Sequence, residues 1–103
     1  MANDVKIRGK IKDGVATVKS LMVHPMETGT RRDADGNLIP AHYIEKVAAY
    51  KNDQEVLTAD WGASISKNPF LSFRVKNAAP GDVIRITWVD NTGATGTGEA
   101  VLK

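Results

Sequence analysis

Ile84-Arg85-Ile86-Thr87-Trp88 is the stretch that decides the fold class of this chain. Its three apolar residues alternate with Arg85 and Thr87, as expected of a β-strand with one buried and one solvent-exposed face. Turn-forming residues lie on both sides, at 79–82 and at 90–93, so the strand is short. A short alternating strand between two turns is typical of an all-β domain.

The same pattern recurs along the rest of the chain. Asp13-Gly14 separates two apolar-rich runs, and a two-residue Asp-Gly linker is the strongest short-range signal of a β-hairpin. No segment shows a sustained period of 3.6 residues. These features predict an all-β fold, an immunoglobulin-like antiparallel β-sandwich of about seven strands, with a small barrel as the alternative. The expected strands cover residues 5–12, 15–23, 43–51, 55–61, 70–76, 84–88 and 95–103.

Two local details stay open. Gly9 occupies an inward position of the first strand and predicts a β-bulge or a close approach of backbone. The register of the second strand is ambiguous, because two sets of residues compete for its inner face: Val15, Leu21 and Val23 against Ala16, Val18 and Met22.

Length and composition indicate one globular domain, residues 1–103. The chain has no cysteine, which excludes a disulfide framework, a thiolate metal site and a cysteine nucleophile. A net charge of +2 does not predict binding to nucleic acid or to a membrane, and no apolar run is long enough to span a bilayer. Residues 1–6 lack the layout of a secretory signal, so the chain taken alone predicts no export.

The connection 24–40 interrupts the strand pattern. It contains two prolines, two glycines and five charged residues, with no apolar period. An irregular segment of this length inside a compact domain is more often functional than incidental. We therefore expect the function of the domain to depend on this connection.

Several fragments resemble catalytic or metal motifs without completing them. Residues 33–37 begin like a calcium-binding loop but lack its later glycine and glutamate, so they predict a polar turn at Asp35-Gly36. The segment 62–66 starts like a nucleophile elbow and ends in serine, and the glycines of 93–98 predict a flexible final hairpin rather than a dinucleotide site. The sequence thus predicts no enzyme and no cofactor. A copper site at His24, Met26 and His42 remains an alternative.

A row of basic residues lines the first strand: Lys6, Arg8, Lys10 and Lys12. No aromatic residues are interleaved with them for base stacking, which argues against nucleic acid. The row predicts the outer face of an edge strand, where lysines discourage unwanted pairing. The alternative is that this face steers an acidic partner protein.

Two blocks of sequence stand out in order along the chain. The first is His24-Pro25-Met26-Glu27-Thr28-Gly29, continued by Arg31, Asp33, Gly36, Ile39 and Pro40. The second is Ala59-Asp60, then Ile65-Ser66, then Asn68-Pro69-Phe70-Leu71-Ser72-Phe73. In this order and separation the blocks resemble the SoxZ family, the small subunit of the sulfur-oxidation carrier complex SoxYZ, and the resemblance extends over nearly the whole chain.

The resemblance implies an immunoglobulin-like sandwich that forms a heterodimer with SoxY. SoxY carries pathway intermediates on a cysteine in its flexible C-terminal arm, so the reactive thiol is expected on the partner. The resemblance also implies transient encounters with the c-type cytochrome, the thiosulfohydrolase and the sulfur dehydrogenase of the periplasmic pathway. Export together with a signal-bearing SoxY would replace the expectation of no export.

Residues that contact SoxY are expected in the two blocks, because interfaces favour aromatic and methionine anchors. The predicted contact residues are His24, Pro25, Met26, Glu27, Thr28, Gly29, Arg31, Asn68, Pro69 and Phe70. Trp61 is a further candidate, although Trp61 and Phe70 could equally fill the core. The remaining alternative is a free-standing structural or adhesion sandwich.

Overall fold

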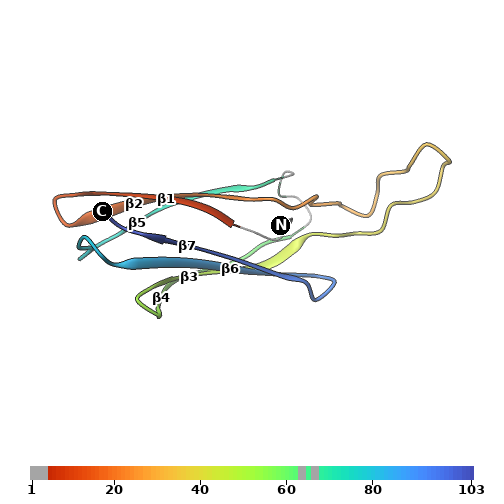
Figure 1. Cartoon of the computed structure of the whole chain (residues 1–103). Helices are drawn as coiled ribbons and strands as arrows, with labels where there is room; N and C mark the ends of the chain where they lie inside the picture. Colours follow the sequence, from red (N-terminus) through yellow and green to blue (C-terminus); the bar gives the residue numbers. More distant parts are fainter. Residues whose placement is uncertain (1–4, 63–64, 66–67) are drawn as a thin grey trace.

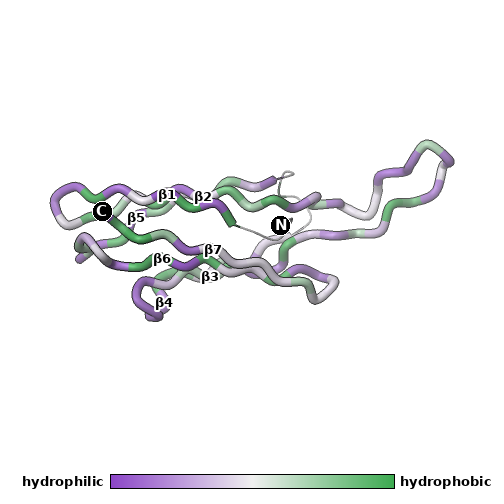
Figure 2. Tube along the Cα trace, viewed as in Figure 1, coloured by the Kyte–Doolittle hydropathy of each residue, from purple (hydrophilic) through white to green (hydrophobic). Residues whose placement is uncertain are grey.

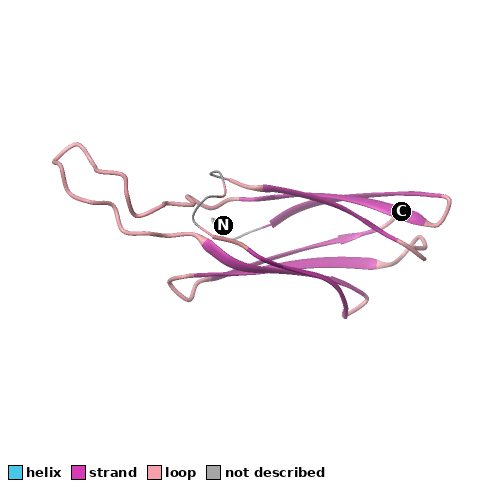
Figure 3. Cartoon of the chain, turned by 180° about the vertical axis from the view of Figure 1, so that it is seen from behind, coloured by secondary structure: helices cyan, strands magenta, loops and turns pink. Residues whose placement is uncertain are grey.

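The computed structural model describes residues 5–62, 65 and 68–103, and these form seven β-strands in two antiparallel sheets (Figure 1). No helix occurs among these residues, as Figure 3 shows, and so none is available to cross a bilayer. The predicted all-β sandwich is confirmed. The strands are β1 (Val5–Lys12), β2 (Val15–Met22), β3 (Ile44–Lys51), β4 (Gln54–Asp60), β5 (Phe70–Val75), β6 (Val83–Asp90) and β7 (Thr95–Val101).

One sheet has the order β1-β2-β5 and the other has the order β4-β3-β6-β7. β4 therefore pairs with β3, whereas in the constant-type immunoglobulin arrangement the fourth strand pairs with the fifth. β1 also lies against β7, so an edge strand of one sheet contacts an edge strand of the other. The architecture is thus a three-on-four variant of the predicted sandwich.

Two tight turns close hairpins, and the first of them is the Asp-Gly turn predicted from the sequence. Asp13 and Gly14 have φ angles of 54° and 78°, and Asn52 and Asp53 have φ angles of 51° and 67°. Positive φ at both central residues is the mark of a type I′ turn, whose twist matches that of the flanking strands. The local chemistry of these dipeptides therefore sets the β1–β2 and β3–β4 pairings.

The structure resolves the ambiguous register of β2. Its inner face carries Ala16, Val18, Ser20 and Met22, each at most 1% exposed. Ser20 obscured this alternation in the sequence, because a hydroxyl stands where an apolar residue is expected. Its Oγ donates a hydrogen bond of 2.9 Å to the carbonyl oxygen of Leu71 on β5, which satisfies the buried group.

The core lies between β2, β3 and β6. Ile84, Ile86 and Trp88 are at most 2% exposed, which confirms the inner face predicted for β6. Strand alternation places Ala49 on the buried face of β3 and Tyr50 on its outer face, and the bulge opposite this pair lies in β4, where Val56 has no partner. On the outer face the guanidinium of Arg85 lies 4.6 Å from the Tyr50 ring centroid, a cation–π contact.

Two glycines fit the close approach between β1 and the C-terminal strand. A Cβ atom at Gly98 would collide with the carbonyl oxygen of Val5, so β7 packs there against backbone. A Cβ atom at Gly9 would collide with Cδ2 of Leu102. The prediction for Gly9 was wrong in kind, because β1 pairs without a bulge and the close neighbour is a side chain. The prediction of a merely flexible final hairpin is also corrected, since Gly98 is required by packing.

The connection between β2 and β3 leaves the sandwich as a projecting arm, residues 24–43 (Figure 1). It extends the long axis of the molecule, which measures 53 × 23 × 19 Å. Of the segment that resembles a nucleophile elbow, residues 63–64 and 66 lie outside the described part of the chain.

Candidate functional site

The arm is a narrow two-sided ladder rather than an irregular loop. Near its base, Glu27 and His42 exchange backbone hydrogen bonds of 2.7 and 3.0 Å. Further out, the amide of Ile39 donates to the carbonyl oxygen of Arg31 at 2.8 Å. The carboxylate of Asp33 accepts the amides of Asp35 and Asn37 at the tip, which confirms the predicted polar turn. These bonds give the arm a defined direction.

The outer half of the arm is open to solvent. All residues of 30–38 are exposed, and the apolar Leu38 is 53% exposed. Figure 2 shows hydrophilic residues at the turn and an apolar stretch on the returning side of the arm. The ion pair of Arg31 with Glu27 is also largely exposed on its arginine side and adds little stability. An exposed, ordered, partly apolar projection is a natural contact element for another protein.

The base of the arm rests on one buried carboxylate at the end of β6. Nε2 of His24 lies 3.0 Å from Oδ2 of Asp90, and Nε2 of His42 lies 2.8 Å from the same oxygen. The side chains of His24 and Asp90 are 2% and 0% exposed, while that of His42 is 39% exposed. The His24 ring packs edge-on against Trp88, with 5.0 Å between ring centroids. The entry and exit of the arm are thus held to the same point of the core.

Asp90 is ionised by its hydrogen bonds despite its burial. Burial is the largest single influence on its pKa and would raise it. Hydrogen bonds from Thr92, His24 and His42 together outweigh burial, so the pKa of Asp90 lies well below its usual range. The second oxygen, Oδ1, accepts the amides of Thr92 and Ala94 and the Thr92 hydroxyl. The carboxylate is therefore fully engaged.

The proton arrangement in this cluster disfavours the copper alternative. The donor atoms of His24, His42 and Asp90 lie within 4.8 Å of one another, close enough to suggest a metal site. However, Nδ1 of His24 accepts the amide of Met26 at 3.1 Å, so the ring proton resides on Nε2 and is directed at Asp90. The sulfur of Met26 in turn accepts the Ile44 amide at 3.3 Å. A metal on His24 would have to break these hydrogen bonds, and we assign the cluster a structural role.

The structure brings the two sequence blocks together. The amide of His24 donates to Oδ1 of Asn68 at 3.0 Å, and the amide of Asn68 donates to the carbonyl oxygen of His24 at 2.9 Å. The amide of Met22 donates to the carbonyl oxygen of Pro69 at 3.0 Å. Asn68 has a φ of 51°, a conformation that asparagine tolerates better than most residues. The second block thus supports the start of the arm from one side.

The predicted contact residues divide into two groups. His24 and Met26 are 3% and 5% exposed, so they support the arm from beneath. Pro69 is also buried, whereas Asn68 is exposed. Phe70 is 62% exposed and does not fill the core, whereas Trp61 is half-buried and packs against it. The remaining predicted residues on the arm are exposed or half-buried: Pro25, Glu27, Thr28, Gly29 and Arg31.

Sequence reasoning missed Asp90, the centre of the cluster. It reads as the first residue of the turn 90–93, where a polar residue is expected to be exposed. A usable signal was its position directly after the clearest core strand, where the alternation places it on the inner face with Trp88. The prediction that β1 is an edge strand, by contrast, is confirmed.

Comparison with known proteins supports the resemblance noted in the sequence. Residues 5–101 match the family described as "Sulphur oxidation protein SoxZ". No curated protein sequence gave a match to the chain. The family match covers all seven strands and the whole arm. The chain therefore belongs to the SoxZ family.

Proposed function

We propose that this chain is the non-catalytic subunit of a SoxYZ carrier complex and that its projecting arm forms part of the contact with SoxY. Membership of the family already indicates a role in sulfur oxidation. The proposal adds the partner, whose C-terminal cysteine arm would carry the covalent sulfur intermediates. This chain would help to present them to the periplasmic enzymes.

The observation that carries the proposal is the anchored arm. A buried ionised carboxylate is costly unless hydrogen bonds compensate it, and here Asp90 is used to fix both ends of one connection. The sandwich core does not need this connection to be long, because Glu27 and His42 pair near its base and a short turn could join them there. A length of chain that is ordered, anchored and then left exposed supports a recognition role.

The composition supports a non-catalytic role. With no cysteine in the chain, a carrier thiol has to come from another chain. The histidine–carboxylate cluster, which could otherwise suggest acid–base chemistry, directs both histidine Nε2 atoms at a saturated carboxylate. The proposal extends to a periplasmic location, reached by export with SoxY, and to transient encounters with the c-type cytochrome, thiosulfohydrolase and sulfur dehydrogenase of the pathway.

The test is co-purification with SoxY, using a variant that lacks only the outer arm. Glu27 and His42 form a reciprocally hydrogen-bonded pair, so residues 28–41 can be replaced by Asn-Gly to give a two-residue hairpin. We expect this variant to keep its fold and to lose SoxY in a pull-down. The matched control is Lys46→Glu, at an exposed residue of β3 in the four-stranded sheet. This variant should still bind SoxY.

Two outcomes would overturn different parts of the proposal. Full SoxY affinity in the arm-shortened variant would refute the role of the arm and leave the heterodimer intact. A wild-type chain that stays monomeric in the presence of SoxY would refute the carrier-subunit function itself and favour the free-standing sandwich.

A further inference from the structure

The two sheets differ sharply in charge. The three strands of the β1-β2-β5 sheet contain six basic residues and no acidic residue. The four strands of the other sheet contain three basic residues and five acidic residues, which are Lys46, Lys51 and Arg85 against Glu45, Glu55, Asp60, Asp90 and Glu99. We call the six basic residues of the β1-β2-β5 sheet the basic face: Lys6, Arg8, Lys10, Lys12, Lys19 and Arg74. All six are exposed.

Strand register places these charges side by side. Arg8 on β1 lies directly opposite Lys19 on β2, and Lys10 is in one cross-strand row with Thr17 and Arg74. Like charges directly opposite each other destabilise a sheet. Among the described residues, none of the six forms an ion pair that would offset this repulsion. The arrangement is unfavourable for the isolated chain.

Protection of an edge strand explains only part of the pattern. Lysines on β1 discourage pairing with another chain, because β1 is an edge of its sheet. Lys19, however, lies on the central strand β2, where no edge needs protection. The charge therefore belongs to the whole face of the sheet, and it creates a local field that attracts acidic surfaces.

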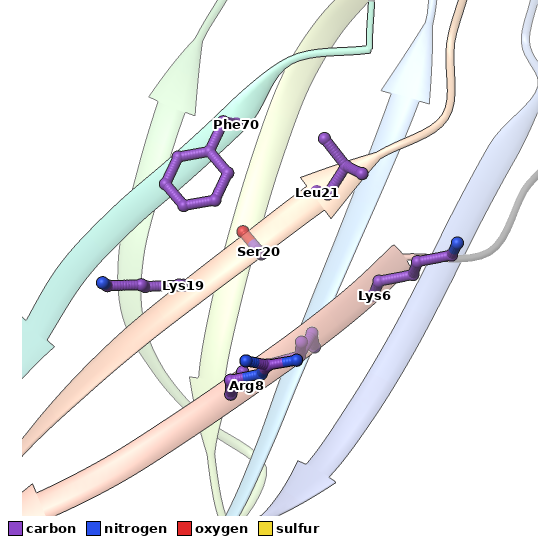
Figure 4. A pocket seen from close by; sticks show the side chains of 7 residues that line it. Lys6, Arg8, Lys19, Ser20, Leu21 and Phe70 are labelled. Carbon is purple, nitrogen blue, oxygen red and sulfur yellow. The ribbon is translucent and has the colours of Figure 1, made fainter.

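An apolar anchor lies at one end of the basic face. Phe70 is opposite Leu21 on β2, and Leu21 is opposite Lys6 on β1. A shallow groove there is lined by Lys6, Ile7, Arg8, Lys19, Ser20, Leu21 and Phe70. Figure 4 shows these side chains on the three neighbouring strands, with Phe70 on β5, Lys19 on β2 and Arg8 on β1. Phe70 and Arg8 are of residue types that are enriched at protein interfaces, and they line the same groove.

We propose that the basic face, with Phe70 as its apolar anchor, is a docking surface for an acidic patch of a protein other than the one held by the arm. Charge complementarity identifies the class of partner, because six clustered cations favour carboxylates over neutral surfaces. A single aromatic residue is too few for the base-stacking platform of a nucleic-acid site. The groove lies at the end of the sheet from which the arm departs, since Leu21 is the second-last residue of β2. A partner docked there would sit beside whatever the arm holds.

The proposal predicts binding that is fast, salt-sensitive and confined to one face. The probe is a random copolymer of glutamate and leucine. Poly-L-glutamate serves as a comparison probe, because it has the acidic side chains without the apolar ones. Titration into the isotope-labelled chain should shift amide resonances of β1, β2 and β5. The affinity should fall steeply as ionic strength rises, because salt screens exposed charges.

Charge reversal supplies the matched variants. Arg8→Glu with Lys19→Glu should lower the affinity for the copolymer about tenfold or more. The control pair Lys46→Glu with Arg32→Glu changes the net charge equally and lies on β3 and on the arm, away from the basic face. At an ionic strength that screens the net charge, it should leave the affinity within about twofold of the wild type. The Phe70→Ser substitution should lower the affinity for the copolymer more than the affinity for poly-L-glutamate. Thermal unfolding of each variant verifies that it is folded.

The outcomes separate this proposal from the proposed function. An equal loss in the two charge-reversed pairs would overturn it, because the effect would then come from net charge alone. Tighter binding of an oligothymidylate or of anionic phosphatidylglycerol vesicles than of the acidic copolymer would overturn the assignment to a protein. Loss of SoxY together with the copolymer in the Arg8→Glu/Lys19→Glu variant would overturn the separation of the two surfaces. Copolymer binding retained by the arm-shortened variant would support it.

Discussion

His24 and Asp90 are 66 positions apart in the chain, yet Nε2 of the histidine lies 3.0 Å from the carboxylate, with both side chains almost wholly buried. This contact joins the start of the arm to the end of β6. His42 reaches the same oxygen from the other side of the arm. The buried pair thus converts a long connection into a fixed projection.

Replacing Asp90 by asparagine should destabilise the fold, although the two side chains have nearly the same volume. The Asp90→Asn substitution would remove the negative charge of a carboxylate that takes part in five hydrogen bonds. We expect the free energy of unfolding to fall by about 3 kcal/mol, the usual effect of breaking a buried charged network. Urea unfolding measures it. The control Asp53→Asn, at a carboxylate that is 83% exposed, should change stability by less than about 0.5 kcal/mol.

The contribution of Asp90 should disappear in acid. Its pKa is lowered in the folded state, so its stabilisation is complete above the unfolded pKa of about 3.9 and is lost as pH falls toward the folded value. The difference in stability between the wild type and Asp90→Asn should therefore shrink as pH drops from about 5 to about 2. The lowered pKa of Asp82, set mainly by Asn52, is common to both proteins and cancels. A stability difference that stays constant across this pH range would contradict the lowered pKa of Asp90 in the folded state.

The two histidines should not be equivalent. His24→Ala removes a buried ring that packs on Trp88 and leaves a cavity, so we expect a loss of about 3 kcal/mol. His42 is partly exposed, so water can replace its hydrogen bond, and His42→Ala should cost about 1 kcal/mol. Chemical denaturation of both variants decides the order. A larger effect at His42 would show that the anchor has been assigned to the wrong residue.

Glycine substitutions should rank according to what the new methyl group meets. Gly98→Ala drives a Cβ atom into the backbone of Val5, which cannot move without separating β1 from β7, so we expect a loss of about 3 kcal/mol. Gly9→Ala meets only the flexible end of Leu102 and should cost about 1 kcal/mol. Gly62→Ala has no neighbour within 4 Å and serves as the control. Melting temperatures of the three variants give the ranking.

The arm tip should matter for binding and not for stability. Leu38 is 53% exposed, so Leu38→Ser should leave the free energy of unfolding within about 0.5 kcal/mol of the wild type. If Leu38 contacts SoxY, its loss should weaken the complex about tenfold. Val101→Ser, at a residue 57% exposed on β7, is the matched control. Calorimetric titration with SoxY compares them, and an equal effect of both substitutions would exclude a specific role for the arm tip.

The strands were predictable because their signals are local. Alternation through Ile84, Ile86 and Trp88 reflects the two-residue period of a strand, and Asp13-Gly14 reflects the positive φ of a type I′ turn. Ser20 defeated the same reasoning in β2, since its acceptor, the carbonyl oxygen of Leu71, is on a strand far along the chain. Patterns based on side-chain polarity fail where a distant partner satisfies a buried polar group.

The candidate site was only half visible in the sequence. The connection 24–40 was identifiable by its length and composition, and its family resemblance followed from the residues themselves. The roles within it were not, because His24 and Met26 became buried supports and Leu38 became the exposed apolar residue. Burial depends on what packs above a residue, and that information is absent from its neighbours in sequence.

By itself, the sequence determined the number and approximate positions of the strands and the hairpin turns, since these depend on residues that are close together along the chain, and the order of its two blocks indicated the family. The tertiary structure alone decided that β4 joins β3, that Lys19 and Arg74 extend the basic row of β1 into a basic face, and that Asp90 receives two histidines from opposite sides of the arm. Each of these depends on strand pairing across long separations. Register and sheet order place residues opposite one another, and hydrogen bonding and packing over the whole domain fix both.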